Sequence, residues 1–295
     1  MTGAYICPIY DKEKDFEYGY KLVESAVKCG TSEDLYFVFS DQAQQDKFMD
    51  HCMKRFDKKP GKILYDDPLK DCRNPVSMKK WYGIRALSDQ YDYIAAIDCE
   101  CIFLKAQHTG QILDEIWNTQ SFLRCNKSTV GASDVKKCAE ALGLDQDERL
   151  IRETQGFTLT WWFNEIPVYK AADLNAFFEW LDEPDRYKTV YHEWCCFDYY
   201  VYVMWLILYR DMHLRALPYT NIAGTIEGLW GSLSFNKAGI EKCFNTHWTS
   251  RNESLENNER LCIQFHTDRR FTGNRFVRFL KKVKRMVLSI GRQIK

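Results

Sequence analysis

The sequence predicts an α/β fold of the Rossmann type, with a mostly parallel central sheet and helices on both faces. Through the first hundred residues, short apolar segments alternate with segments of helical spacing, which is typical of parallel strands covered on both sides. The 295 residues are 45% hydrophobic and 15% aromatic, so the chain can bury a large core. Charged residues make up 28%, which is ordinary for a globular protein.

The first expected elements are a strand, a helix and a second strand. The strand over 5–10 is an apolar run that contains Pro8 and leads into a polar turn. The helix over 16–29 has apolar residues at helical spacing and closes at Gly30. The second strand, over 35–39, is a continuous apolar run, and together these elements begin a strand–helix–strand unit.

Two more helices and two more strands follow in the same alternation. A helix is expected over 42–56, before a third short strand over 62–65. The helix over 75–87 has a proline in its first turn, where proline is tolerated. The strand over 93–97 is nearly all apolar, as expected for the buried middle of a sheet.

The second half of the chain has a less regular pattern and contains most of the tryptophans. An aromatic-rich helix follows Asp198, and a glycine-containing loop comes later. The elements expected there are a strand pair over 157–163 and 167–169, helices over 171–181 and 198–209, a loop over 224–234 and a strand over 261–265.

Two carboxylates follow the strand expected over 93–97. Asp98 and Glu100 are separated by one residue, and a period of two places them on the same side of an extended backbone. Carboxylate oxygens are the ligands that Mg²⁺ and Mn²⁺ prefer, and such a cation can bridge the phosphates of a nucleotide. The alternative interpretation is a solvated acidic turn without a ligand.

This segment resembles the Asp-x-Asp motif of GT-A-fold glycosyltransferases, here in an Asp-x-Glu form. Its place after an apolar strand, about 90 residues beyond the first strand, fits that family. The resemblance implies a bacterial-type enzyme of surface-glycan biosynthesis that uses a UDP- or GDP-sugar, with Mn²⁺ or Mg²⁺ as cofactor. It further implies a glycan or lipid-linked acceptor, and metal ligation by Asp98 and Glu100.

Donor contacts are expected at the carboxyl ends of the strands, where ligands of parallel sheets bind. Tyr10 suits stacking on a base, and the two lysines that open the helix over 75–87 suit pairing with phosphate. A structural tyrosine and an exposed helix face are the alternatives. The expected donor-binding residues are Tyr10, Asp11, Asp67, Lys79, Lys80 and Asp98.

Three residues of the second half complete the site that the resemblance implies. His266 follows the strand expected over 261–265, where many GT-A enzymes supply a third metal ligand. If the enzyme inverts, Asp198 is expected to be the general base that takes the acceptor proton, with Glu193 as the next candidate. The alternatives are a hydrogen-bonded structural histidine and an aspartate that caps a helix.

The end of the chain is basic and amphipathic. Residues 269–295 hold ten Lys or Arg and no Asp or Glu, so the other 268 residues carry a formal charge of −10. Apolar residues recur at helical spacing from 275 onward, which predicts an amphipathic helix on an anionic membrane surface. A helix packed on its own domain, or one that binds a partner protein or nucleic acid, is the alternative.

These observations predict a catalytic domain over 1–268 and a membrane-docking tail over 269–295. Within the domain, 1–105 is the expected nucleotide-sugar-binding half and 106–268 the acceptor-binding half. No basic patch interleaved with aromatic residues lies outside the tail, so nucleic acid is not an expected partner. The protein is therefore expected in the cytoplasm, peripheral on the inner face of the cell membrane.

Two other functions compete with glycosyl transfer. A nucleotidyltransferase that makes nucleotide sugars would carry a glycine-rich loop after its first strand, and the segment 8–15 has no glycine. A non-catalytic membrane adaptor would leave the acidic strand ends without a purpose.

The start of the chain and its cysteines bear on the compartment. The first residues lack the charged and apolar regions of a signal peptide, and the longest apolar run, 199–209, is too short to span a bilayer. None of the twelve cysteines forms a Cys-x-x-Cys pair, so free buried thiols in a reducing compartment are expected rather than zinc ligands or disulfides.

Overall fold

The fold is seen in a computed structural model of the chain. The structure describes residues 1–10, 12–65, 75–106, 108–119, 124–125, 132–154, 158–159, 166–184, 186, 189–190, 198–214, 224–226 and 262–265.

A five-stranded sheet with the order β3-β2-β1-β4-β8 forms the centre of the fold. The first four strands are mutually parallel and β8 pairs antiparallel with β4 at one edge. The strands are β1 (Gly3–Pro8), β2 (Leu35–Phe39), β3 (Gly61–Leu64), β4 (Tyr93–Ala96) and β8 (Val168–Lys170). This confirms the predicted mostly parallel sheet, although β1 lies two residues nearer the N-terminus than the run over 5–10 suggested.

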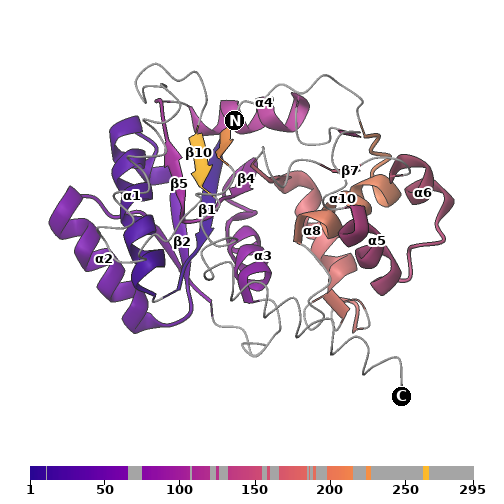
Figure 1. The fold of residues 1–295 in the computed structure, drawn as a ribbon, viewed down its shortest axis with the longest axis horizontal. Coiled ribbons are helices and arrows are strands. Elements are labelled where there is room, and N and C mark those ends of the chain that lie inside the picture. The colour runs from indigo at the N-terminus through magenta and orange to yellow at the C-terminus, as the bar shows by residue number, and fades with distance from the viewer. Residues whose placement is uncertain are drawn as a thin grey trace, which may run out of the picture.

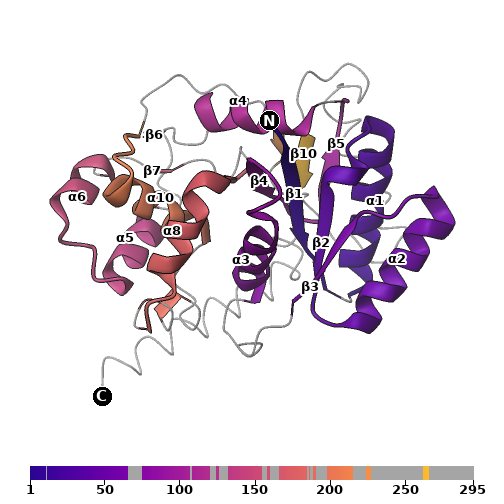
Figure 2. The ribbon, with the colours of Figure 1, turned by 180° about the vertical axis from the view of Figure 1, so that it is seen from behind.

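Helices cover both faces of this sheet. Successive residues of β1 point to opposite faces, so each face can be followed from one of them. Tyr5 packs on Phe103 on one side, with ring centroids 4.9 Å apart. Ile6 packs against α3 on the other, where Gly83 allows a close approach. Figures 1 and 2 show α1 and α2 on one side and α3 on the opposite side. The helices are α1 (Glu13–Cys29), α2 (Gln42–Phe56), α3 (Pro75–Leu87) and α4 (Thr109–Thr119).

The ends of these helices follow from local chemistry. Asp41 caps α2 by accepting a hydrogen bond from the backbone N–H of Gln44 at 2.8 Å. Gly30 closes α1 in the left-handed conformation, with a φ of 73° that costs glycine little. These signals explain why the predicted bounds of α2 and the predicted C-terminus of α1 are confirmed.

A second group of helices lies beyond α3, on the side away from α1 and α2 (Figures 1 and 2). The predicted helices over 171–181 and 198–209 are confirmed with the same bounds. Aromatic rings join the layers, since Phe177 of α8 contacts Trp81 of α3 and Trp205 of α10 edge to face. The group contains α5 (Ala132–Ala141), α6 (Glu148–Thr154), α8 (Ala171–Leu181) and α10 (Asp198–Tyr209).

Two predictions for the second half are wrong. The pairing expected between the strands over 157–163 and 167–169 is not found among their described residues, because β8 joins β4 while β7 (Thr158–Leu159) pairs with β6 (Arg124–Cys125). The loop expected over 224–234 begins with a strand, β9 (Gly224–Ile226). It joins β5 (Cys101–Phe103) and β10 (Cys262–Phe265) in a separate three-stranded sheet.

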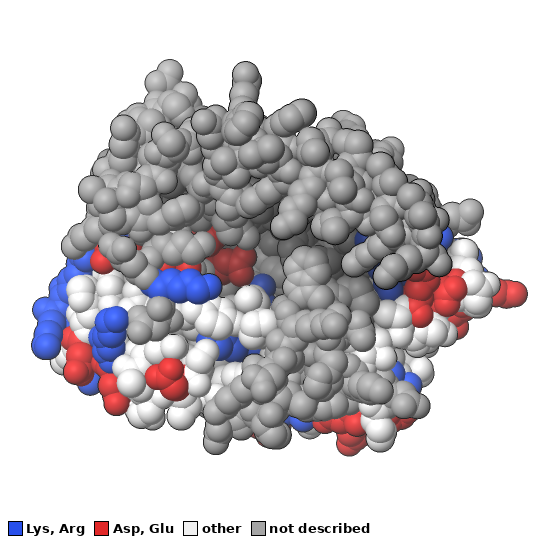
Figure 3. Space-filling model, turned by 60° about the horizontal axis from the view of Figure 1, so that its bottom comes forward, with Lys and Arg blue, Asp and Glu red and all other residues white. Residues whose placement is uncertain are grey.

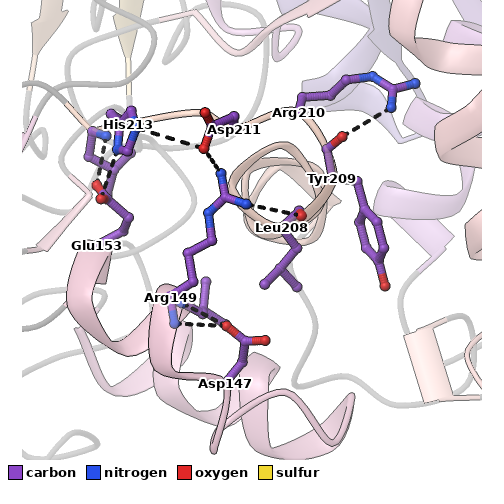
Figure 4. Close-up of polar contacts among 10 residues, drawn as sticks. Asp147, Arg149, Glu153, Leu208, Tyr209, Arg210, Asp211 and His213 are labelled. Carbon is purple, nitrogen blue, oxygen red and sulfur yellow. Dashed lines mark hydrogen bonds and ion pairs between the residues drawn. The ribbon is translucent and has the colours of Figure 1, made fainter.

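The end of α10 is tied to α6 by a polar cluster (Figure 4). Arg149 contacts the carboxylate of Asp211 and donates a hydrogen bond to the carbonyl of Leu208. The buried carboxylate of Glu153 contacts Nδ1 of His213 at 3.0 Å. These contacts fix α10 at one end, while its first residue, Asp198, lies near α3 at the other.

The described cysteine side chains are free and buried, as predicted. Six of the cysteines lie in the described part of the chain as free, buried thiols: Cys7, Cys29, Cys52, Cys99, Cys101 and Cys138. None of the described helices has the length and apolar character needed to span a bilayer. The predicted tail over 269–295 lies outside the described residues.

Candidate active site

Strand β4 leads into a tight turn that carries the two predicted metal ligands. Ile97 is still held in the sheet by a hydrogen bond from its N–H to the carbonyl of Ile6, 2.9 Å away. The chain then reverses, and the N–H of Cys101 donates to the carbonyl of Asp98 at 3.1 Å. Asp98 and Glu100 are therefore the first and third residues of a turn. The expectation of an extended backbone between them is wrong, because the strand ends at Ala96.

The small sheet brings a distant segment to this turn. Strand β10 runs antiparallel to β5, and Gln264 pairs with Cys101, the residue directly after Glu100. The last residue of β10, Phe265, lies one position further towards the turn, and His266 follows it in sequence. The register thus directs the chain from β10 towards the acidic turn. His266 itself lies outside the described residues.

Lys80 links the acidic turn to the second group of helices. Its ammonium lies 3.3 Å from Oδ1 of Asp98, and the two side chains are 13% and 37% exposed. Burial by itself lowers the pKa of Lys80, but the carboxylates of Asp98 and Asp198 together raise it above its ordinary value. Lys80 is therefore a permanent cation between one carboxylate at the end of β4 and another at the start of α10.

Asp198 is buried and fully engaged. Only 5% of the residue is exposed, and its two oxygens accept hydrogen bonds from Ser77 and Tyr169, each at 3.1 Å. Burial and the charge of Asp198 raise the pKa of Tyr169, so this hydroxyl stays a donor. The sequence did not reveal either partner, because they lie 121 and 29 residues away along the chain.

Lys79 lies beside Lys80 in sequence but faces a different part of the site. It is 1% exposed, and its ammonium donates a hydrogen bond of 2.6 Å to the carbonyl of Ile9, just beyond β1. The same ammonium lies 3.6 Å from the centroid of the Tyr10 ring. The structure thus brings Lys79 and Tyr10 together, with the lysine beneath the strand end rather than at the surface.

The buried thiol of Cys7 shows that these groups converge electrostatically. Burial raises the pKa of Cys7 well above its ordinary value, and the charges of Asp98 and Glu100 raise it further while Lys80 lowers it. Both carboxylates of the turn and the Lys80 ammonium therefore act on the same point near the end of β1. The turn after β4 and the end of β1 therefore lie close together, at the edge of the sheet where ligands of parallel sheets bind.

The oxygen ligands of the turn fit a hard divalent cation in chemistry. Within the described part of the chain, no group of three or more His, Cys, Asp or Glu side chains is arranged to hold a metal. The described part of the chain supplies two carboxylates, those of Asp98 and Glu100, and the end of β10, which runs towards them. Three of the predicted residues, Asp11, Asp67 and Glu193, lie outside the described residues, as His266 does.

Figure 3 gives a view of the face towards which the strand ends point. The chain begins at the upper edge of Figure 1, so β1 and its parallel neighbours run downwards, and Figure 3 turns the lower side forward. On this face the described acidic and basic side chains lie next to one another.

Three solved structures resemble this fold over most of the chain. Mouse xyloside xylosyltransferase 1 is 8% identical with a TM-score of 0.46, covering 90% of this chain and 97% of that one. A cytidylyltransferase from Leptospira borgpetersenii serovar Hardjo-bovis is 9% identical with a TM-score of 0.39, covering 88% and 91%. Core-mannan synthase A from Aspergillus fumigatus, in a Mn/GDP form, is 11% identical with a TM-score of 0.40, covering 70% and 69%.

No protein-family model matches the sequence, and no curated protein matches it either. Because the structural likenesses have TM-scores below 0.5, the function has to be inferred from the residues of the site.

Proposed function

We propose that this protein is a glycosyltransferase that transfers a sugar from a UDP- or GDP-sugar to a glycan or lipid-linked acceptor. The observation that carries the proposal is the convergence of three elements at one end of the sheet. The end of β1 supplies an aromatic ring, the turn after β4 supplies two carboxylates, and the register of β5 with β10 directs the chain before His266 to that turn. A nucleotide diphosphate needs such a set of groups.

In this proposal the chain's own residues bind the donor and balance its charge. Tyr10 stacks on the base at the centre of the strand ends. Lys80 faces the phosphates as a point charge, held in place by Asp98. Transfer breaks the bond between the anomeric carbon and the phosphate oxygen, while the acceptor oxygen bonds to that carbon and gives its proton to a base.

A divalent cation would be held by Asp98 and Glu100, with His266 as the third ligand. Bound there, it would neutralise the charge that develops on the departing diphosphate. Both carboxylates stand in one turn, and Asp98 is partly exposed, so the turn is open to a ligand from outside. The ammonium of Lys80 limits repulsion between the turn and Asp198 before the donor binds.

The contacts of Asp198 favour a second role beside the predicted one of general base. A carboxylate that is 5% exposed and accepts two hydrogen bonds is suited to holding Lys80 in position. The substitution Asp198→Asn separates the two roles. A base acts on the acceptor, so its loss spares donor binding and abolishes transfer. A positioning residue acts through Lys80, so its loss weakens donor binding as well.

The decisive test is hydrolysis and transfer with a panel of UDP- and GDP-sugars, with and without Mn²⁺. The proposal expects release of UDP or GDP from at least one donor, and loss of that activity in Asp98→Asn. As a matched control, Asp89→Asn changes an exposed aspartate on a turn before β4 and should leave turnover unchanged. Release of pyrophosphate from a nucleoside triphosphate and a sugar phosphate would instead identify a nucleotidyltransferase.

We also propose that the tail over 269–295 holds the enzyme on an anionic membrane surface, on the cytoplasmic side. Its ten basic residues contrast with a formal charge of −10 on the rest of the chain, which such a surface would repel. A lipid-linked acceptor would then be presented to an enzyme that is already at the membrane.

A further inference from the structure

Lys79 occupies an unusual place for a lysine, inside the fold at the point where β1 ends. Lysine is almost never fully buried unless it is paired, yet this residue is 1% exposed. Its ammonium has two described contacts, a hydrogen bond of 2.6 Å to the carbonyl of Ile9 and the face of the Tyr10 ring at 3.6 Å. Both contacts hold the segment that follows the central strand.

This geometry argues against direct contact between Lys79 and a donor phosphate. The ammonium points to a backbone carbonyl beneath Tyr10, whereas Lys80, one residue later on α3, points to Asp98. A cation against a ring restrains the orientation of that ring, and a charged hydrogen bond to the Ile9 carbonyl restrains the backbone before it. Lys79 is thus built to act through Tyr10.

We propose that Lys79 is a positioning residue for the donor site, which fixes Tyr10 for stacking on the nucleotide base. This rests on the proposed function, in which Tyr10 contacts the base. The two features that carry it are the burial of Lys79 and its paired contacts with Ile9 and Tyr10.

The charge of Lys79 responds to pH in the range that matters. Burial lowers the pKa of Lys79 from 10.5 to about 7, although Cys7 of β1, Asp15 of α1 and Asp41 at the start of α2 act to raise it. Lys12, before α1, lowers it further. Below pH 7 the ammonium is charged and keeps its contacts with the Tyr10 ring and the carbonyl of Ile9. As pH rises through about 7 the charge is lost, and with it the cation–π contact.

The test measures binding of UDP-glucose and GDP-mannose by calorimetry from pH 6 to 8.5, because their esterified phosphates do not titrate in this range. We expect the affinity of the wild type for the donor it binds to fall severalfold with rising pH. Lys79→Met should bind about tenfold more weakly at pH 6, with no such pH dependence. Lys79→Gln, which keeps a donor for the Ile9 carbonyl but has no charge, should also show a flat profile.

A double-mutant cycle separates positioning from a general loss of structure. If Lys79 acts through Tyr10, Lys79→Met should weaken binding in the wild type and add nothing in a Tyr10→Leu background. Equal losses in both backgrounds would overturn the proposal, as would wild-type affinity and pH dependence in Lys79→Met. Lys136→Met, at an exposed position on α5, is the matched control and should bind like the wild type.

A second readout does not depend on the donor. In a tyrosine-labelled sample, the ring resonances of Tyr10, assigned by their absence in Tyr10→Leu, should shift with a midpoint near pH 7. The shift should vanish in Lys79→Met. A ring that ignores pH in the wild type would overturn the inference about Lys79. Failure of the wild type to bind any sugar nucleotide, with the ring shift intact, would overturn the proposed function instead.

Discussion

Lys79→Met should change how the stability of the protein depends on pH. The pKa of Lys79 is about 7 in the folded protein and 10.5 as an ordinary lysine, so between these values the unfolded chain binds a proton that the folded protein has released. By linkage, stability rises with pH wherever the unfolded state binds more protons, so the penalty for burying the charged amine is complete below pH 7 and disappears towards 10.5.

 The destabilisation by the buried charge is therefore largest below pH 7, shrinks as pH rises and is gone near 10.5. Wild-type stability should therefore rise with pH relative to a variant that lacks the amine.

The size of the effect follows from the two pKa values. One pH unit within the window is worth about 1.4 kcal/mol for one proton. Integrated from pH 7, where the folded amine is half-protonated, to pH 9, the gain is about 2 kcal/mol. Loss of the donor to the Ile9 carbonyl costs the variant about 1–3 kcal/mol at every pH, so it shifts the whole curve without changing its slope.

Urea unfolding, followed by tryptophan fluorescence at pH 7, 8 and 9, measures this difference. Groups that titrate in both proteins cancel when the free energy of unfolding of Lys79→Met is subtracted from that of the wild type. The remaining difference should grow by about 2 kcal/mol in favour of the wild type. Lys136→Met, whose amine is exposed, should show no such trend. Parallel pH curves for Lys79→Met and the wild type would refute the reasoning.

Three further predictions concern the metal and the membrane. Asp98→Asn and Glu100→Gln should each lower transfer by about 100-fold or more while leaving the circular dichroism spectrum unchanged, and full activity in EDTA would contradict a metal role. His266→Gln should weaken Mn²⁺ binding measured by electron paramagnetic resonance, and unchanged Mn²⁺ affinity would return this histidine to a structural role. Removal of residues 272–295 should release the protein from anionic vesicles and spare transfer to a soluble acceptor. Indifference of the full chain to such vesicles at low salt would rule out membrane docking.

The parts of the fold that were predicted correctly depend on signals within a short stretch of chain. The helix bounds at 42–56, 171–181 and 198–209 match the structure because local spacing and end residues decide them. The partners of short strands depend on distant segments instead. Strand β7 has two residues and β8 has three, which is too short for a pattern that would indicate β6 or β4 as the partner. The expected pairing of β7 with β8 was therefore wrong.

For the site, too, the sequence predicted individual residues but not how they are arranged. Asp98 and Glu100 stand out in sequence because they follow an apolar strand, but the turn that holds them shows only in the fold. Lys79 and Lys80 were equivalent candidates in the sequence. On a helix, however, successive residues point about 100° apart, so one faces β1 and the other faces the carboxylates.

Helix α3 explains how one short segment serves two parts of the site. Ser77 and Lys80 are three residues apart and share the face towards Asp198, while Lys79 and Gly83 are four apart and share the face towards the sheet. Gly83 decides how closely that face approaches, because a Cβ there would lie 2.8 Å from a methyl carbon of Val38.

Because α3 lies close to the sheet, the ammonium of Lys79 reaches the segment at the end of β1. The same position of α3 brings the ammonium of Lys80 to the turn after β4. A displacement of α3 would therefore alter the Tyr10 contact and the Asp98 contact together. In the proposed donor site, base recognition and phosphate recognition would thus be coupled through the packing of a single helix on the central strand.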